Sequence, residues 1–453
     1  MIRDSIEHAT HCTGGRLWLP QGRSASAEFA GMTHDSRLLR PGMLYVAIVG
    51  SRVDGHDFLD DAASRGAAAA LVSRRIEAAP LAQIEVVDVV RAMGDLARAW
   101  RASLPVRLVA VTGSNGKTTV KTMLAAILAR SALTLATRGN YNNEIGVPLT
   151  LAALGEKHRY AVVEMGCSQS GDIAYLAGIG QPDVAVVTNA GPAHLERLGD
   201  IEGVARTKGE LFSALGPDGV AVINLDDRYA DYWRSLCPDR RQIGFGRDPK
   251  ARVRLELRGS EEWVVTPEGE FQLVLTLPGA HNRMNALAAT AAAIALGLAP
   301  AEIAAALASV ESIPGRLYER RMAAGWTLID DSYNANPASL YAALNVLAER
   351  PGRRWLVLGN MAELGTESTK LHREIGIAAR DLGVDRLFAF GEHAAAAADA
   401  FGEGSEMFGA LEPLLQRLEA GLEAGVTCLV KGSRSAGMDR VVARLDREEV
   451  ASC

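Results

Sequence analysis

The sequence has few cysteines and no paired cysteine motif. Five cysteines are scattered over 453 residues, and none forms a Cys-x-x-Cys pair. This pattern excludes a zinc ribbon or a dithiol redox motif, and the odd number with wide spacing argues against a disulfide framework. We therefore expect a protein of a reducing compartment.

Long apolar runs are also missing. The longest, residues 286–299, is rich in alanine and contains Thr290. It is shorter than the roughly 20 residues that a membrane span needs. The N-terminal segment has no apolar core of the kind found in secretory signals. We expect a cytoplasmic protein that inserts into no membrane.

An excess of positive charge is absent as well. Lys and Arg number 48 against 54 Asp and Glu, which gives a net charge of −6. The chain thus lacks the electrostatic footprint of a nucleic-acid-binding protein. Apolar residues make up 48% of the chain, which is enough to build several cores. At roughly 150 residues per domain, the length predicts about three domains.

The order of apolar runs divides the chain into three α/β domains, 1–104, 105–314 and 315–453. The first is small, with a mixed or parallel sheet. In the second, continuous apolar runs alternate with helical stretches, which is typical of a parallel sheet buried on both faces. The third has the pattern of a doubly wound, Rossmann-like unit, with two helices expected between residues 390 and 426. The expected strands of the central domain are 106–112, 160–165, 184–189 and 219–224, followed by β-rich segments within 251–277 and a helix at about 282–296.

A glycine-containing loop lies between the first central strand and a helical stretch. Strand, glycine loop and helix are the context that a P-loop requires, because backbone N–H groups and the helix N-terminus converge on phosphate oxygens. Lys117 would reach the β- and γ-phosphates, and the Thr118 hydroxyl would bind Mg²⁺. Val111 stands where the standard pattern has glycine, so the loop is a shortened variant. The candidate nucleotide-binding residues are Thr112, Gly113, Ser114, Asn115, Gly116, Lys117, Thr118 and Thr119.

Polar residues follow two other strands of the central domain. Glu164 ends the run 160–165, and His194 follows the run 184–189. Because the carboxyl ends of parallel strands face the ligand crevice, the Glu164 carboxylate is a candidate Mg²⁺ ligand. A solvated strand end is the alternative for both, and it is stronger for His194, since imidazole is not a typical Mg²⁺ ligand.

Three further segments allow more than one interpretation. Lys208 lies in a helical stretch, where a solvated surface lysine is the ordinary interpretation. Asn282 opens an alanine-rich helix and either caps it or contacts a ligand. Residues 330–337, with two Asp and two Asn after an apolar strand, fit turn chemistry and capping as well as a ligand site.

Taken together, these segments resemble the ATP-dependent Mur ligases of bacterial cell-wall synthesis over essentially the whole chain. The loop 112–119 is similar to that shared by Mur ligases and folylpolyglutamate synthases. Segments 140–148 and 331–337 look specific to the dipeptide-adding member of the family. Asn360 stands where the family more often has Asp. Further matching segments are 34–37, 53–56, 164–166, 189–196, 281–285 and 429–434.

The resemblance implies an ATP- and Mg²⁺-dependent ligase that forms a C–N bond between UDP-N-acetylmuramoyl-tripeptide and D-Ala-D-Ala, through an acyl phosphate. The three domains would hold the uridine nucleotide, ATP and the dipeptide in that order, in a chain that we expect to be a monomer. The resemblance also implies that Lys117, Glu164, His194 and Lys208 are catalytic. Thr118, Glu164, His194 and a carbamylated Lys208 would surround metal ions. The nucleotide would also contact Asn282, Arg316 and Asp331. The implied substrate-binding residues are Ser36, Arg37, Asn140, Asn143, Asn334, Asn336, Ser433 and Arg434.

Other functions remain open at this point. Another Mur ligase that adds a single amino acid, or a folylpolyglutamate synthase-like ligase, would share the loop. The roughly 104 residues ahead of the loop argue against the latter. A non-catalytic nucleotide-binding module would need neither Glu164 nor the 330–337 segment. A small-molecule kinase would release a stable phosphorylated product and form no amide.

Overall fold

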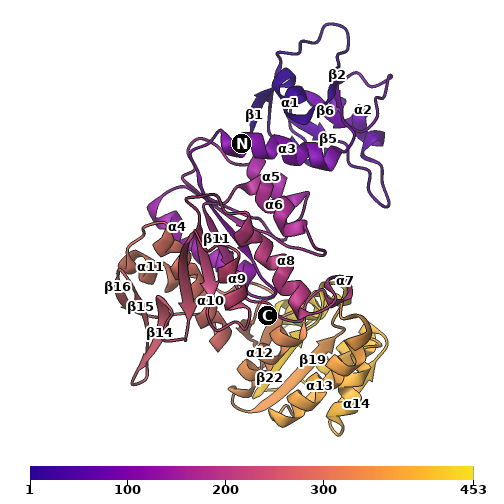
Figure 1. The fold of residues 1–453 in the computed structure, drawn as a ribbon. Helices are drawn as coiled ribbons and strands as arrows, with labels where there is room; N and C mark the ends of the chain where they lie inside the picture. Colours follow the sequence, from indigo (N-terminus) through magenta and orange to yellow (C-terminus); the bar gives the residue numbers. More distant parts are fainter. Residues whose placement is uncertain (452–453) are drawn as a thin grey trace.

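The computed structural model describes residues 1–451 and contains three successive α/β units (Figure 1). The N-terminal unit lies at the top of that view, the central unit in the middle and the C-terminal unit below it. The expected α/β fold with largely parallel sheets is confirmed. In the described residues, no helix is long and apolar enough to cross a membrane.

The N-terminal unit has a five-stranded sheet and a two-stranded ribbon. Strands β4 to β7 run parallel, and β2 joins β7 antiparallel at the edge. The sheet order is β2 (Arg16–Trp18), β7 (Ala82–Glu85), β6 (Ala69–Val72), β5 (Leu44–Val46) and β4 (Met32–Thr33), the ribbon is β1 (Arg3–Ser5) and β3 (Glu28–Ala30), and the helices are α1 (Ile6–Thr13), α2 (Leu59–Ser64) and α3 (Val89–Ala102).

The central unit is built on a nine-stranded sheet. Its order is β16 (Gly269–Gln272), β15 (Glu261–Thr266), β14 (Val253–Arg258), β13 (Arg241–Gly246), β12 (Val220–Asn224), β11 (Val184–Val187), β8 (Arg107–Thr112), β10 (Tyr160–Glu164) and β9 (Thr134–Ala136). The four expected strands of this unit are confirmed to within two residues. The β-rich segments extend this same sheet, because β13, which the sequence analysis did not identify, pairs with both β12 and β14.

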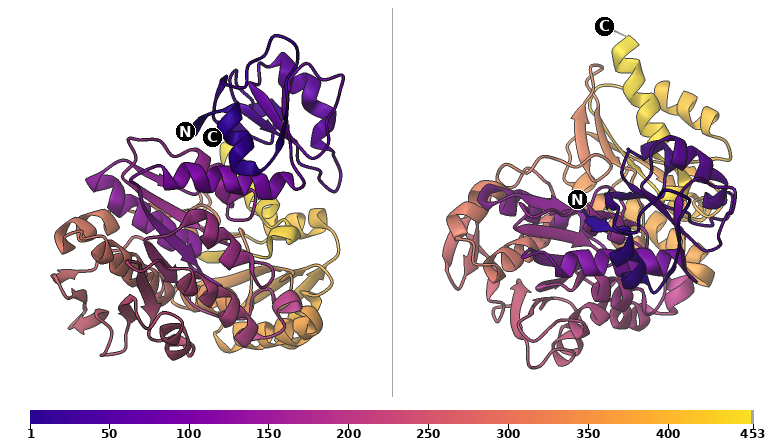
Figure 2. Two further views of the ribbon diagram at one scale, coloured as in Figure 1. Left: turned by 45° about the horizontal axis from the view of Figure 1, so that its top comes forward. Right: turned by 90° about the horizontal axis from the view of Figure 1, so that it is seen from above.

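Helices cover both faces of the central sheet (Figures 1 and 2). Alternate residues of each inner strand enter different cores: Val109 and Val111 pack on one side, and Leu108 and Ala110 on the other. This explains why the strands are continuously apolar. The helices of the unit are α4 (Lys117–Ser131), α5 (Gly146–Ala152), α6 (Asp172–Gly180), α7 (Leu195–Leu198), α8 (Ile201–Ser213), α9 (Ala230–Ser235), α10 (Ala280–Ala295) and α11 (Pro300–Leu307).

The C-terminal unit has a six-stranded sheet, parallel except for β17 at one edge. Its order is β17 (Tyr318–Arg321), β18 (Thr327–Asp331), β22 (Val426–Lys431), β19 (Arg353–Gly359), β20 (Arg386–Phe390) and β21 (Ser405–Phe408), and its helices are α12 (Pro337–Ala348), α13 (Ser368–Asp381), α14 (Ala395–Phe401), α15 (Leu411–Glu419) and α16 (Asp439–Ala451). The two helices expected between residues 390 and 426 are α14 and α15, with the short edge strand β21 between them.

The parallel strands bring the polar strand ends to one edge of the central sheet. Thr112 pairs in register with Val187, and Glu164 with Val111, so the P-loop, Glu164 and the segment after β11 start side by side. This edge faces the C-terminal unit, and the candidate site lies there.

The core under the P-loop helix supports this arrangement. Leu124 of α4 is fully buried in the central core. Leu124→Ala should destabilise the central unit by about 3 kcal/mol, because it leaves a cavity under the sheet. The change would be measured by native-state hydrogen exchange of the β8 and β10 amides, since a chain of several units need not unfold in two states. Leu257→Ala is the control, because Leu257 is 72% exposed. An unchanged opening free energy in the Leu124 variant would contradict this packing.

Candidate active site

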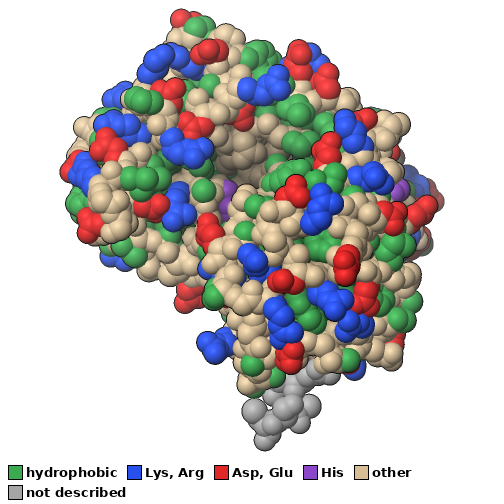
Figure 3. All heavy atoms as spheres, turned by 90° about the horizontal axis from the view of Figure 1, so that it is seen from below, with side chains coloured by type: hydrophobic (Ala, Val, Ile, Leu, Met, Phe, Trp, Pro, Cys, Tyr) green, Lys and Arg blue, Asp and Glu red, His purple; other side chains and the backbone are tan. Residues whose placement is uncertain are grey.

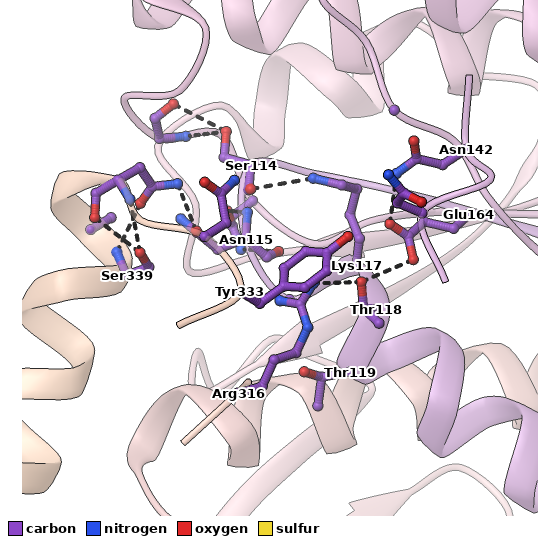
Figure 4. Close-up of a pocket in the computed structure, with 18 of the residues that line it drawn as sticks. Ser114, Asn115, Lys117, Thr118, Thr119, Asn142, Glu164, Arg316, Tyr333 and Ser339 are labelled. Atoms are coloured by element: carbon purple, nitrogen blue, oxygen red, sulfur yellow. Dashed lines mark hydrogen bonds between the residues drawn. The ribbon is translucent and has the colours of Figure 1, made fainter. Parts of the chain in front are cut away.

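A cavity of about 640 Å³ lies between the central and C-terminal units. Its lining includes the P-loop, Glu164 and His194 from the central unit, and Arg316 and Asn336 from beyond residue 314. The molecule is hollowed on the face shown in Figure 3, where positive and negative side chains are interspersed. Figure 4 shows that the side chains of both units point toward each other in this cavity.

The P-loop takes a conformation that only glycine permits at two positions. Gly113 and Gly116 have φ values of 149° and 81°. A Cβ atom at Gly113 would lie 1.8 Å from Thr188 Oγ1, and one at Gly116 would lie 2.2 Å from Asn285 Oδ1. The loop is fastened to the segment after β11, because the Asn115 amide donates to Asn189 Oδ1 over 3.0 Å. The expected strand, loop and helix arrangement is present, with α4 beginning at Lys117.

Lys117 folds back over the loop. Its Nζ donates to the carbonyl oxygens of Gly113, at 2.6 Å, and Ser114, at 3.3 Å. Burial, reinforced by the charges of Lys208 and Arg316, lowers the pKa of Lys117 to about 8. The ammonium therefore stays charged at neutral pH, in a place where an anion would find little competing water.

Glu164 is the carboxylate on which this part of the cavity converges. Thr118 Oγ1 donates to Glu164 Oε2 over 3.0 Å, and Asn142 Nδ2 donates to Oε1 over 2.9 Å. Lys121 Nζ lies 3.2 Å from Oε2. Burial by itself would raise the pKa of Glu164, but the nearby lysines and Asn142 hold that pKa below its usual value. The charged carboxylate is thus fixed next to the Thr118 hydroxyl.

The donor set of this corner fits Mg²⁺. Thr118 and Glu164 offer hard oxygen ligands next to the phosphate loop, and Mg²⁺ usually takes one or two carboxylates and completes its shell with phosphate oxygens and water. Among the residues that the structure describes, no group of three or more His, Cys, Asp or Glu side chains could hold a metal alone. A site completed by phosphates agrees with both observations.

His194 lines the same cavity but is also paired across it. Its Nδ1 contacts Glu363 Oε2, which belongs to the C-terminal unit. That hydrogen bond is the main cause that lowers the pKa of Glu363. His194 was expected to bind a metal ion, and its pairing with Glu363 was not foreseen from the sequence.

Lys208 is not a surface residue. It is only 1% exposed, so the interpretation as a solvated lysine is wrong. It lies in α8, does not line the cavity, and its Nζ is 3.6 Å from Cys167 Sγ, which does. Its burial was not apparent from the sequence, because other polar residues lie next to Lys208 in α8.

The C-terminal unit places two side chains on the P-loop. Arg316 donates from its guanidinium to Thr118 Oγ1 over 2.8 Å and lies over the Tyr333 ring at 4.3 Å. Asn336 Nδ2 donates to Asn115 Oδ1 over 2.8 Å. Asn336 also caps α12, so the capping and ligand-site interpretations of this segment are compatible.

A buried ion pair lines the cavity next to these residues. Lys431 is 2% exposed and its Nζ contacts Asp331 Oδ2, while it also donates to the Asn334 carbonyl at 3.0 Å. Burial raises the pKa of Asp331 against the opposing effect of Lys431. The pair fixes the strand end from which the 331–336 segment enters the cavity.

Asn282 does not cap its helix. Helix α10 begins at Ala280 with Gly279 as its N-cap, so Asn282 lies inside the first turn. Its Nδ2 donates to the Pro278 carbonyl at 2.7 Å, and its Oδ1 accepts from Asn285. His281 lines the cavity beside it, and burial, with the charges of Lys431 and Arg283, lowers the pKa of His281 to about 4. A neutral imidazole and two amides therefore border this end of the cavity.

Not all expected site residues meet in the cavity. Asn140, Asn143, Asn334 and Arg434 line it, in addition to those described above. Ser433 is buried and is not among the lining residues, and Arg434 pairs with Asp439 at 3.0 Å. Ser36 and Arg37 lie in the N-terminal unit, outside this cavity, where Arg37 pairs with Asp35 at 2.7 Å. Thr112 Oγ1 is buried and has no hydrogen-bond partner among the residues that the structure describes.

Lys121 and Glu363 were missed from the sequence. Lys121 lies four residues after Lys117 in α4, on the same helix face, and this spacing was the available signal. Glu363 reaches the site from a loop, for which the sequence offers no periodicity. Asn142 lies in the segment 140–144 that was expected to contact the substrate, but its contact with Glu164 was not foreseen.

Comparisons with known proteins agree along the whole chain. Family models for the Mur ligase family catalytic domain, the Mur ligase middle domain and the Mur ligase glutamate ligase domain match residues 28–101, 111–293 and 315–434. The UDP-N-acetylmuramoyl-tripeptide–D-alanyl-D-alanine ligase of Escherichia coli K12 is 42% identical, with 100% of both chains covered. A crystal structure of MurF from Acinetobacter baumannii has a TM-score of 0.90 at 33% identity and covers 98% of this chain and 99% of that one. The MurF ligase of Thermotoga maritima in complex with ADP has a TM-score of 0.82 at 28% identity and covers 94% of this chain and 99% of that one.

The pKa of Lys117 generates a prediction for anion binding. The cation is lost as the pH rises through about 8. The affinity of the protein for a nucleoside triphosphate should therefore fall about tenfold between pH 7 and pH 9, since binding must restore the proton. Calorimetric titration across this range measures it. Lys117→Arg stays charged, so its affinity for the nucleotide should not change over this pH range. An affinity that falls as steeply in that variant as in the wild type would contradict a role of the Lys117 proton in binding.

Proposed function

The chain belongs to the Mur ligase family, and from this we propose that it joins D-Ala-D-Ala to UDP-N-acetylmuramoyl-tripeptide at the expense of ATP. The relatives that match over their full length carry the name of this dipeptide-adding ligase. We propose the cytoplasm as the place of this step of peptidoglycan precursor synthesis, and a monomer as the working unit.

One observation supports the proposal most directly. A P-loop lysine, a charged buried carboxylate and an arginine from the next unit meet in one cavity, at Lys117, Glu164 and Arg316. This set of groups suits a triphosphate that must meet a second anion, because positive charge is supplied from both sides.

The chemistry explains why a triphosphate is needed. A carboxylate is a poor electrophile and does not condense with an amine in water. Transfer of the γ-phosphoryl group to the terminal carboxylate of the tripeptide gives an acyl phosphate with a good leaving group. Attack by the amino group of the dipeptide then forms a tetrahedral intermediate, from which phosphate leaves and the amide remains.

The residues of the cavity would act mainly by position and charge. Lys117 and Arg316 would stabilise the negative charge that two approaching anions create. Thr118 and Glu164 would hold Mg²⁺, with His194 and a carbamylated Lys208 proposed at a second ion. Bound Mg²⁺ neutralises phosphate charge and orients the triphosphate.

The remaining residues are assigned to the substrates as part of the proposal. Residues 1–104 would hold the uridine nucleotide, with Ser36 and Arg37, and the 140–144 loop would contact the acceptor. Residues 105–314 would bind ATP, and 315–453 the dipeptide, with Arg434 near its carboxylate. The amide-lined end of the cavity at Asn282 would take the adenine. The contacts between the two units would exclude water from the acyl phosphate.

ADP release with and without the dipeptide tests the proposal. With UDP-N-acetylmuramoyl-tripeptide and ATP, we expect steady turnover only when D-Ala-D-Ala is added, and a product whose mass has increased by the dipeptide less one water. Lys117→Ala should abolish ligation and ADP release together, while the affinity for the UDP-linked substrate stays close to the wild-type value.

Other results would point elsewhere. Turnover with a single amino acid or with glutamate in place of the dipeptide would assign the chain to another ligase. A stable phosphorylated product without an amide would identify a kinase.

A further inference from the structure

The two units that enclose the cavity meet at a second point, away from the P-loop. Helix α7 (Leu195–Leu198) and the turn η3 (Gly365–Glu367) pack against each other, and Figure 1 shows α7 next to the C-terminal unit. The Glu196 amide donates to the Glu363 carbonyl over 3.4 Å. Close to this contact, His194 Nδ1 pairs with the Glu363 carboxylate.

Both partners of this pair have an uncommon backbone conformation. His194 has a φ of 56° and Glu363 a φ of 61°, in the left-handed region that side chains with a Cβ rarely adopt. A glycine would avoid the strain at either position, yet each carries an ionisable side chain that faces the other. The two strained residues therefore point to a contact with a role in function.

The pair also determines which ring nitrogen of His194 is left for a ligand. Nδ1 is bound to Glu363, whereas Nε2 has no hydrogen-bond partner in the described chain, and the ring lines the cavity. Histidines that bind metals usually donate their other ring N–H to a carboxylate or carbonyl, which fixes the tautomer and the ring orientation. Here that carboxylate comes from a different unit.

We propose that Glu363 is a positioning residue that orients His194 and leaves its Nε2 free, and that it does so only when the C-terminal unit is docked on the central unit. His194 would then be ready to bind a metal ion next to the phosphates only in the closed arrangement, which excludes water. The inference rests on the proposed function, because it assumes that His194 takes part in that reaction.

The first test measures the tautomer in the full-length protein without nucleotide or metal. ¹⁵N spectra of imidazole-labelled protein, with the His194 signal assigned from His194→Gln, are recorded at about pH 8.5, well above the ordinary imidazole pKa. We expect the proton on Nδ1 in the wild type, and its loss from Nδ1 in Glu363→Ala. The same protonation pattern in both proteins would overturn the proposal.

Two further variants separate the loss of the carboxylate from a folding defect and from a general effect on this region. Glu363→Gly removes the carboxylate and relieves the positive φ, so it should shift the tautomer like Glu363→Ala even if the alanine variant folds poorly. Glu367→Ala is the matched control: Glu367 lies in η3, four residues after Glu363, and pairs with Lys370 at 2.9 Å. Its loss should leave the His194 spectrum unchanged. An equal shift in the control would also overturn the proposal.

The second test separates kcat from the binding steps. Glu363→Ala should lower kcat or raise the Mg²⁺ concentration for half-maximal rate by about 10–100-fold, the usual effect of removing such a supporting partner. The KM for the UDP-linked substrate should stay unchanged, and Glu363→Gln, whose amide oxygen still accepts a hydrogen bond, should recover part of the loss. A change in that KM alone would contradict a role through His194. If the wild type formed no amide, the proposed function would fail, while the ¹⁵N result would still judge the Glu363 contact.

Discussion

The cavity depends on the contacts that hold the buried negative charge of Glu164. A carboxylate in this position is costly unless cations and donors surround it. Lys121, Asn142 and Thr118 contact it directly. Thr118 and Lys121 belong to α4, and Asn142 belongs to the loop after β9. Their contacts with Glu164 therefore also join α4 to that loop.

The cations of the cavity are held in place by oxygen atoms of the chain itself. Lys117 binds carbonyl oxygens of its own loop, and Arg316 binds the Thr118 hydroxyl. A triphosphate bound here would compete with these oxygen atoms for the two cations. Because Arg316 and Asn336 reach the loop from beyond residue 314, the same contacts also hold the C-terminal unit against the central one. Binding of phosphate and docking of the units are thus linked through shared side chains.

Much of the fold could be predicted from the sequence, and the reason is periodicity. The inner strands of the central sheet are apolar on both faces, so β8, β10, β11 and β12 are visible as continuous runs. Strand β13 has the sequence Arg-Gln-Ile-Gly-Phe-Gly, whose polar and glycine positions hide it, although it connects the β-rich segments to the sheet. The short strand β21 lies at a sheet edge, where a half-exposed segment gives little signal.

The candidate site was predictable in part for a similar reason. Lys117, Thr118 and Glu164 occur where a loop or a strand ends, and sheet topology alone brings them together. Lys208 was misjudged because a charged residue in a helix is usually exposed. The His194–Glu363 contact joins residues 169 positions apart in two different units, and a single sequence contains no local pattern for such a pair.

In the proposed reaction, a triphosphate activates an acid before the amine attacks. UDP-N-acetylmuramoyl-tripeptide labelled with ¹⁸O in its terminal carboxylate tests this directly, with mass analysis of the inorganic phosphate released during ligation. An acyl phosphate predicts one labelled oxygen in each phosphate molecule, since the bridging oxygen leaves with phosphorus. Phosphate without the label, formed while the amide accumulates, would contradict an acyl phosphate intermediate.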